Sequence, residues 1–304
     1  MAIAGPTGSG KSELSLRIAA EFQGEVVNCD SLQLYRYLDI GTAKLPVEER
    51  RGIPHHMLDV LTPDRICSAG EYARLARPVL HEIAARGRLP VVAGGTGFYL
   101  RALLDGLFPG PPRDDALRER LAARERRRPG RLHRILERLD REAAGRIHAN
   151  DIPKLIRALE VIVLTRRNLS ENFARGRDPL AGFRVLKLGL SPPREALYAR
   201  LDRRLERMFA AGLAEEVRRI AAMGYPLEAK PFESHGYKQA VQFIRGELTL
   251  KEALFYAQRN TRRYAKRQLT WFRQEPGMVW LAGFGEDAAV QRDAIAQVRK
   301  FLAA

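Results

Sequence analysis

The N-terminal residues combine glycines, a lysine and a hydroxyl at a spacing that suits phosphate chemistry. The segment follows the pattern Gly, four residues, Gly-Lys-Ser, and it comes directly after a short apolar run. Glycines let the backbone wrap a diphosphate so that several N–H groups point at it. The lysine adds a full positive charge, and the serine hydroxyl is a magnesium ligand. We therefore expect a phosphate-binding loop built from Gly5, Thr7, Gly8, Ser9, Gly10, Lys11 and Ser12, whose ligand need not be a nucleotide.

Three predicted strands would position this loop and its neighbours. The apolar run before the loop is the first strand, and an amphipathic helix pattern follows the loop at once. Residues 25–28 and 89–93 are the next two strand-like runs; Asp30 follows the first of them and Thr96 the second. In an open parallel sheet, residues just past the carboxyl ends of strands face the ligand crevice. The sequence thus predicts an α/β fold with Asp30 and Thr96 beside the phosphate loop.

Each of these two side chains admits two interpretations from sequence alone. Asp30 could hold magnesium through water or accept a proton, but Asp30 and Ser31 would also cap a helix. Thr96 could donate to a phosphate oxygen, while Gly94-Gly95-Thr96-Gly97 could equally be a plain strand-to-helix turn. A kinase or ATPase would often place a magnesium-binding Asp after this strand, and this chain does not.

Composition narrows the class of protein. The 304 residues are 45% apolar, which is ample for a core, and 52 Lys+Arg against 36 Asp+Glu give a formal charge of +16. Such an excess favours a polyanionic partner, with nucleic acid ahead of a membrane surface. The sequence shows neither a membrane span nor a secretory signal, so we expect a cytoplasmic protein. Cys29 and Cys67 are too few for a disulfide scaffold, and the adjacent His55 and His56 do not make a metal site.

The Pro-rich segment 108–112 marks a change of composition. Residues 113–146 carry 12 arginines against seven carboxylates in a helical pattern with a narrow apolar stripe. We expect a helical insertion over 111–149, or to about 180, between core segments 1–110 and 150–304. Arginine-rich helices often simply face solvent. Here, the surplus of arginines over carboxylates and the position after a Pro-rich hinge favour contact with RNA.

Two later helices also carry arginine. In 197–211, Arg200 and Arg204 share a face and could reach a diphosphate, although salt bridges to Asp202 or Glu206 are the alternative. In 253–273, one face bears a basic stripe, and no carboxylate occurs from 253 to 274. We expect this stripe to contact phosphates and the opposite face to be core. The stripe comprises Arg259, Arg262, Arg263, Lys266, Arg267 and Arg273, and the core face comprises Tyr264, Ala265, Leu269, Trp271 and Phe272.

Motifs along the whole chain together resemble those of the bacterial tRNA dimethylallyltransferase family, also called isopentenyl-diphosphate:tRNA transferases. Several of them are specific to that family rather than to phosphate loops in general. Beyond the loop itself, the matching segments are residues 30–36, 39–44, 54–56, 94–100, 147–151, 157–161, 236–238 and 261–268.

The resemblance implies a P-loop NTPase-like parallel sheet flanked by helices, with an inserted all-helical subdomain. It implies transfer of the dimethylallyl group from dimethylallyl diphosphate to the N6 amine of adenosine 37, in tRNAs reading codons that begin with U. Asp30 would be the general base, and Thr96 and Arg200 would hold the departing diphosphate with Lys11, Ser12 and Mg²⁺. The alternatives are a P-loop kinase of a small nucleoside or metabolite, and an RNA-binding protein that uses a nucleotide as a switch.

The resemblance also implies a monomer that binds the tRNA anticodon stem-loop. Pro153-Lys154 and His235 depart from the usual family pattern, which affects the RNA contacts rather than the reaction. The implied RNA-binding residues are Asp30, Ser31, Leu32, Gln33, Thr96, Arg118, Pro153, Lys154, Leu155, Ile156, Arg157, Glu233, Ser234, His235, Gly236, Tyr237, Lys238, Arg262, Arg263, Lys266 and Arg267.

Overall fold

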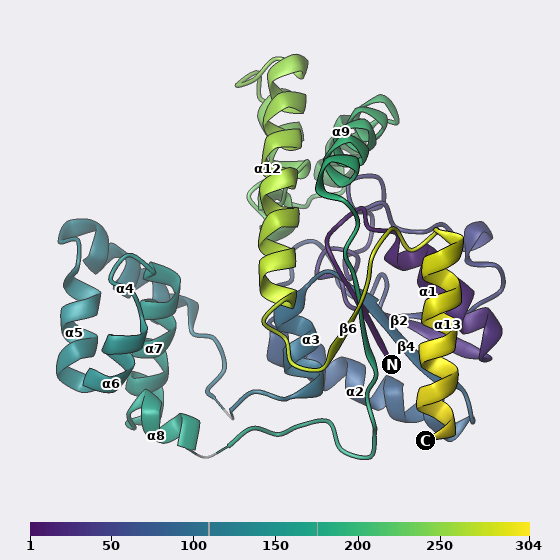
Figure 1. The fold of residues 1–304 in the computed structure, drawn as a ribbon. Helices are drawn as coiled ribbons and strands as arrows, with labels where there is room; N and C mark the ends of the chain where they lie inside the picture. Colours follow the sequence, from purple (N-terminus) through teal and green to yellow (C-terminus); the bar gives the residue numbers. More distant parts are fainter. Residues whose placement is uncertain (109, 175) are drawn as a thin grey trace. The chain divides into compact units, whose positions relative to one another are not determined.

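The computed structural model describes residues 1–108, 110–174 and 176–304 of the chain. In these residues, six strands form one parallel sheet in the order β3-β2-β4-β1-β5-β6. Figure 1 shows this sheet with helices beside it. The predicted α/β class with a parallel sheet is confirmed. The strands are β1 Ala2–Ala4, β2 Gly24–Asn28, β3 His55–His56, β4 Leu89–Gly94, β5 Lys187–Leu190 and β6 Met278–Leu281.

The central strands read as continuous apolar runs because both faces of the sheet are covered. All residues of β1 and β2 are buried. The three strands predicted above correspond to β1, β2 and β4. The apolar pattern of residues 183–190 also indicates a strand, but only Lys187–Leu190 pair in the sheet. Sequence patterning misses β3, whose two polar histidines pair with Val26 and Val27 at the sheet edge.

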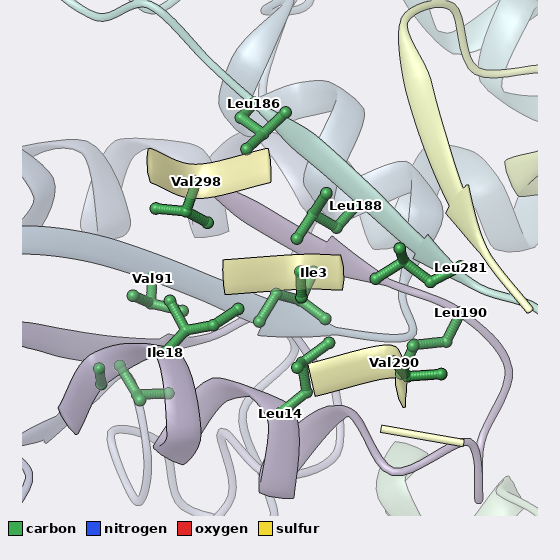
Figure 2. Packing of buried hydrophobic residues seen from close by; sticks show 13 residues of the cluster. Ile3, Leu14, Ile18, Val91, Leu186, Leu188, Leu190, Leu281, Val290 and Val298 are labelled. Atoms are coloured by element: carbon green, nitrogen blue, oxygen red, sulfur yellow. The ribbon is translucent and has the colours of Figure 1, made fainter. Parts of the chain in front are cut away.

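Two helices far apart in the sequence cover one face of the sheet. Helix α1 (Lys11–Glu21) follows the phosphate loop, and α13 (Ala288–Ala303) ends the chain. Leu14 and Ile18 of α1 and Val290 of α13 meet strand residues such as Ile3 and Leu190 in one buried cluster (Figure 2). This cluster fixes the start of α1, and hence the phosphate loop, against the sheet.

Helix α2 (Ala69–Ala85) contacts β2 and β4, and it ends before Gly87. The Ser68 side chain caps it by accepting a hydrogen bond from the Glu71 N–H at 3.1 Å. Its Tyr72 ring stacks on Tyr99 of α3 (Gly97–Leu104) at a centroid distance of 4.8 Å. Leu75 of the same helix is 41% exposed.

Four further helices form a second layer of the core unit. Their shared cluster includes Leu205, Val217, Tyr237 and Ala257, together with Leu38 from the segment after β2. Helix α12 packs against both α9 and α11. The elements are α9 Arg194–Ala210, α10 Leu213–Ala222, α11 Tyr237–Ile244 and α12 Leu250–Phe272, with short 3-10 helices η1 Val47–Arg50 and η2 Lys230–Glu233.

The inserted helices form a compact unit of their own over Leu104–Ala181, separate from the unit made of Met1–Leu103 and Gly182–Ala304. This unit runs past 149 to near the longer expected end of about 180, because α7 (Ile152–Thr165) carries its central buried side chains, among them Leu155 and Leu159. Pro109, part of the predicted breakpoint, lies outside the described residues. The helices are α4 Asp115–Arg127, α5 Arg131–Leu139, α6 Arg141–Arg146, α7 Ile152–Thr165 and α8 Leu169–Ala174.

Within the described part of the chain, no helix is both long enough and apolar enough to cross a bilayer.

Truncating the α1 core should destabilise the protein far more than truncating an exposed leucine. Leu14 is fully buried, so we expect Leu14→Ala to lower the free energy of unfolding by about 2–5 kcal/mol. The matched control Leu75→Ala, on an exposed position of α2, should change it by less than about 1 kcal/mol. Denaturant melts of both variants check this, and equal losses would contradict the packing described for α1.

Candidate active site

The phosphate loop, Asp30 and Thr96 meet because the strands that precede them are neighbours. Strand β4 lies between β2 and β1, with Asn28 paired to Ala93 and Ala4 paired to Gly94. The segments that follow these strands therefore leave the sheet at the same edge, as expected for parallel strands.

The loop has the backbone geometry that its glycines permit. Gly8 and Gly10 have φ of 77° and 87°, a left-handed conformation that glycine adopts without strain. Gly10 precedes α1 directly, so the helix begins at Lys11. The Lys11 Nζ donates to the Gly5 and Pro6 carbonyls at 3.1 and 2.8 Å, which folds the side chain back over the loop.

Burial lowers the pKa of Lys11 to about 8, while Asp30 opposes the shift and Arg204 reinforces it. Burial also lowers the pKa of Arg204, again opposed by Asp30 and reinforced by Arg200. Both cations are thus desolvated close to one carboxylate. An anionic ligand would relieve this unfavourable concentration of positive charge.

Asp30 caps a turn, not the helix that the sequence offered as the alternative, and it also lies at a cavity. Its Oδ1 accepts a hydrogen bond from the Leu32 N–H at 2.9 Å, so it does cap a turn. Its own N–H donates to the Asn28 side chain at 3.0 Å. Asp30 also lines a cavity of about 280 Å³ together with Thr7, Ser31 and other residues. The cap therefore fixes the carboxylate at a place where a ligand can reach it.

Thr96 is held against the Asp30 segment. Its hydroxyl oxygen accepts from the Ser31 N–H at 3.0 Å, and its N–H donates to the Cys29 carbonyl at 3.3 Å. The turn before it needs glycine, since a Cβ on Gly94 would lie 2.1 Å from the backbone of Cys29. Close approach of β4 to the segment before Asp30 accounts for Gly94, whereas a Cβ on Gly95 would meet the Gln268 side chain.

The two arginines of α9 are placed differently. Arg204 lines the cavity with Asp30 and donates to the Thr42 carbonyl at 3.3 Å. Arg200, the residue favoured by the family resemblance, pairs with Glu286 and lies 4.9 Å over the Phe284 ring. Neither salt bridge expected as the alternative forms here, since the cation that pairs with Asp202 is Arg262 of α12.

The Glu286 segment lies directly on the phosphate loop. The Gly285 N–H donates to the Ser9 carbonyl at 2.9 Å, and a Cβ on Gly10 would collide with Gly285 and Glu286. Sequence reasoning missed this contact because no local pattern links residues so far apart. The Glu286 carboxylate is therefore paired with Arg200 beside the phosphate loop, where a leaving group would need this cation.

The segment 233–238 divides between cavity and core. Glu233, Ser234 and His235 line the cavity with Asp30. Tyr237, by contrast, is fully buried and donates its hydroxyl to Glu216 at 2.6 Å. Its ring therefore supports the site from inside and does not offer a surface to RNA, contrary to the expectation. Gly236 is buried as well, while the Lys238 side chain is exposed.

His235 lies close to the basic side chains of Arg267 and Lys238. Its Nε2 lies 3.3 Å from the Arg267 Nη2, and its ring is 5.3 Å from the Tyr264 ring. Burial lowers the pKa of His235, and Arg267 and Lys238 lower it further, which favours the neutral imidazole.

The basic stripe of α12 is partly neutralised, because Arg262 pairs with Asp202 at 2.5 Å. Arg263, Lys266 and Arg267 are exposed and line an open hollow with Thr270, Trp271 and Gln274. They are the members of the stripe best placed to meet phosphates.

Two residues of the opposite face of α12 belong to the site, although sequence analysis assigned that face to the core. Tyr264 lines the cavity, and burial followed by the nearby Asp30 raises the pKa of its hydroxyl well above the usual value. Gln268 is buried and hydrogen-bonded to the phosphate loop. The sequence signal for Gln268 is an amide on an otherwise apolar face.

In the helical unit, several expected RNA contacts are structural. Arg118 forms two hydrogen bonds to the fully buried Glu160, both at 2.8 Å, and Arg157 pairs with the same carboxylate at 2.6 Å. Leu155 is fully buried, so its side chain cannot reach RNA. Pro153 and Lys154 are exposed, and Ile156 is half-buried.

The remaining predicted residues stay near the loop. Ser31 and Leu32 line the cavity, and the Gln33 amide donates to the Thr42 carbonyl at 3.2 Å. Ser12 is exposed at the start of α1. The buried Ser9 hydroxyl lacks a hydrogen-bond partner among the residues that the structure describes.

The lowered pKa of Lys11 predicts how anion binding depends on pH. Lys11 is charged below about pH 8 and loses its charge as the pH rises through that value, so affinity for inorganic diphosphate should fall there. Lys11→Met should weaken binding at pH 7 by about 10-fold to 100-fold and remove that fall. Calorimetric titrations across pH 6–9 test this, with the exposed Lys300→Met as the control. An unchanged pH profile in Lys11→Met would contradict it.

Comparison with known proteins agrees with this geometry. The sequence profile of the IPP transferase family matches residues 33–275. The tRNA dimethylallyltransferase of Solibacter usitatus is 66% identical, over 99% of this chain and 98% of its own length. Its Koribacter versatilis counterpart is 56% identical, over 96% and 95%.

Solved structures give the same result. A full-length tRNA isopentenylpyrophosphate transferase from Bacillus halodurans is 36% identical, with a TM-score of 0.71 over 99% of this chain and 94% of its own. A eukaryotic dimethylallyltransferase captured acting on tRNA is 28% identical, with a TM-score of 0.86 over 99% and 79%. The profile match over most of the chain and the high identities lead to one conclusion: this chain belongs to the IPP transferase family, the tRNA dimethylallyltransferases.

Proposed function

We propose that the protein transfers the dimethylallyl group from dimethylallyl diphosphate to the N6 amine of adenosine 37, in tRNAs that read codons beginning with U. Family membership supports transfer of this group to tRNA. The observation that carries the finer proposal is a carboxylate, Asp30, in a cavity it shares with the phosphate loop and α12. One substrate's leaving group and the other's acceptor atom can then meet beside the same side chain.

Stabilising the leaving diphosphate demands more of the enzyme than activating the amine. An aromatic amine is a weak nucleophile, so most of the barrier must fall through stabilising the negative charge that develops on diphosphate. The N-terminus of α1 and the Lys11 cation face this charge from the loop. Arg204 adds a second desolvated cation at the cavity. Arg200 joins them when the diphosphate replaces Glu286 as its partner.

The acceptor side needs a proton acceptor and a place for one base. As nitrogen bonds to the allylic carbon and the carbon–oxygen bond to diphosphate breaks, the amine proton passes to the Asp30 carboxylate. The capped turn holds that carboxylate in one orientation. Enzymes reach such atoms by extruding the base from the RNA. The cavity walls formed by Ser234, His235 and Tyr264 fit an extruded adenine beside Asp30.

The residues at the loop fit a magnesium ion. Mg²⁺ binds through one or two carboxylates, substrate phosphates and several waters. Ser12 and Asp30 supply a hydroxyl and a carboxylate near the loop, and the described residues contain no group of three or more His, Cys, Asp or Glu that would favour another metal. When bound, the ion would neutralise charge on the diphosphate.

The basic surfaces suit an RNA anticodon stem-loop. The exposed cations Arg263, Lys266 and Arg267 lie on the same helix as Tyr264 of the cavity. The formal charge of +16 favours a polyanion over a free nucleotide as acceptor. We further propose that the enzyme acts as a cytoplasmic monomer, the setting in which it would meet tRNA.

The proposed activity predicts a defined mass gain on RNA. Incubating the protein with Mg²⁺, dimethylallyl diphosphate and an unmodified anticodon stem-loop should add one dimethylallyl group to adenosine 37. Chelating the metal should abolish the gain, and AMP should not replace the RNA as acceptor. Mass spectrometry of RNA fragments locates the group. Prenylated AMP, or a phosphorylated metabolite formed at the expense of ATP, would point to a different enzyme.

Asp30 should be needed for turnover but not for RNA affinity. Asp30→Asn keeps an oxygen that can accept from Leu32 but cannot take a proton, so kcat should fall by about 100-fold or more. The Kd for the stem-loop should stay within about threefold of wild type, since the capped turn remains. Asp64→Asn, at an exposed position, is the control. Near-normal kcat in Asp30→Asn would refute the general-base role.

A further inference from the structure

One buried amide joins the RNA-facing helix to the phosphate loop. Gln268 of α12 is 5% exposed. Its Oε1 accepts from the Thr7 N–H at 2.8 Å, and its Nε2 donates to the Gly95 carbonyl at 2.8 Å. Both bonds have good length, and they use the donor and the acceptor end of the same amide.

The two backbone groups held by Gln268 lie at the two sides of the site. Thr7 lies inside the phosphate loop, between Gly5 and Gly8, while Gly95 immediately precedes Thr96. The Thr7 N–H points at Gln268, so it is not free to bind diphosphate as the sequence analysis expected. This hydrogen bond from Thr7 to Gln268 fixes the orientation of the adjoining peptide groups of the loop.

The same helix presents basic residues to solvent directly beside Gln268 in the sequence. Lys266 and Arg267, the neighbours of Gln268 in sequence, are exposed, whereas Gln268 faces the loop. Helix α12 also packs on α9, which carries Arg204. A helix that meets RNA on one face thus anchors the diphosphate site on the other.

We propose that Gln268 is a positioning residue for the prenyl transfer, which sets the phosphate loop and the Thr96 turn at a fixed separation from α12. It acts on the diphosphate through the Thr7 amide and on the acceptor side through Gly95 and Thr96. The inference rests on the proposed function for its substrates, but not for its contacts. A shift on the order of 1 Å between reacting groups can cost about 100-fold in rate, so such a bridge has kinetic consequences.

Gln268→Met tests the bridge while keeping the side-chain volume. We expect kcat/KM for dimethylallyl diphosphate to fall by about 100-fold, with the Kd for the stem-loop within about threefold of wild type. Gln258→Met is the matched control, because Gln258 lies on the same helix and bonds α9 rather than the loop, through the Asp202 carbonyl at 3.3 Å. Its kcat/KM should stay within about threefold of wild type.

A second variant breaks the bridge from its other end. A Cβ on Gly95 would lie 2.4 Å from the Gln268 Nε2, so Gly95→Ala displaces the amide without removing it. If the two substitutions act on one bridge, the double variant should be no worse than about threefold below the poorer single variant. If Gln268→Met folds poorly, Gly95→Ala tests the bridge in its place.

The outcomes separate this inference from the proposed function. Absence of transfer by the wild-type protein would overturn the function, and affinity for inorganic diphosphate then tests the bridge directly: it should fall in Gln268→Met and not in Gln258→Met. With active wild type, three results would each overturn the positioning role. They are near-normal kcat/KM in Gln268→Met, an equal loss in Gln258→Met, and fully additive losses in the double variant.

Discussion

The site depends on the parallel register of β2, β4 and β1. Because Asn28 pairs with Ala93 and Ala4 with Gly94, the segments that follow these strands leave the sheet side by side. The approach is so close that residue 94 has no room for a side chain against Cys29. The Thr96 hydroxyl can then hold the backbone next to Asp30. A change of register would turn the alternate residues to the wrong face and separate the loop from its carboxylate.

The cations at this edge of the sheet suit a diphosphate that leaves during the reaction. Lys11 and Arg204 lose solvation near Asp30, and Arg200 pairs with Glu286, a carboxylate that we propose the diphosphate displaces. A diphosphate satisfies these cations better as its charge grows, which is the condition for stabilising a transition state more than a ground state. The same phosphate loop that serves nucleotide hydrolysis in other proteins can therefore serve prenyl transfer here.

The sequence predicts well what depends on local pattern. The loop, the Asp30 and Thr96 segments and the strands that precede them follow from turn residues and apolar runs, and the parallel sheet then brings them together. It fails where pairing is long-range. Nothing near Arg118 indicates that Glu160 takes its charge, nothing near Arg262 indicates Asp202, and nothing near Gly10 indicates the segment of Glu286. Gln268 was assigned to no role because its partners are 173 and 261 residues away.

The central claim is that the phosphate loop holds a leaving diphosphate and not a nucleotide to be hydrolysed. The most direct measurement is calorimetric titration of the protein with dimethylallyl diphosphate and with ATP, each with Mg²⁺ and stem-loop RNA, while released inorganic phosphate is recorded. We expect the prenyl diphosphate to bind, with an affinity that Lys11→Met weakens, and no phosphate to be released from ATP. Loop-dependent ATP binding with RNA-stimulated hydrolysis would contradict it.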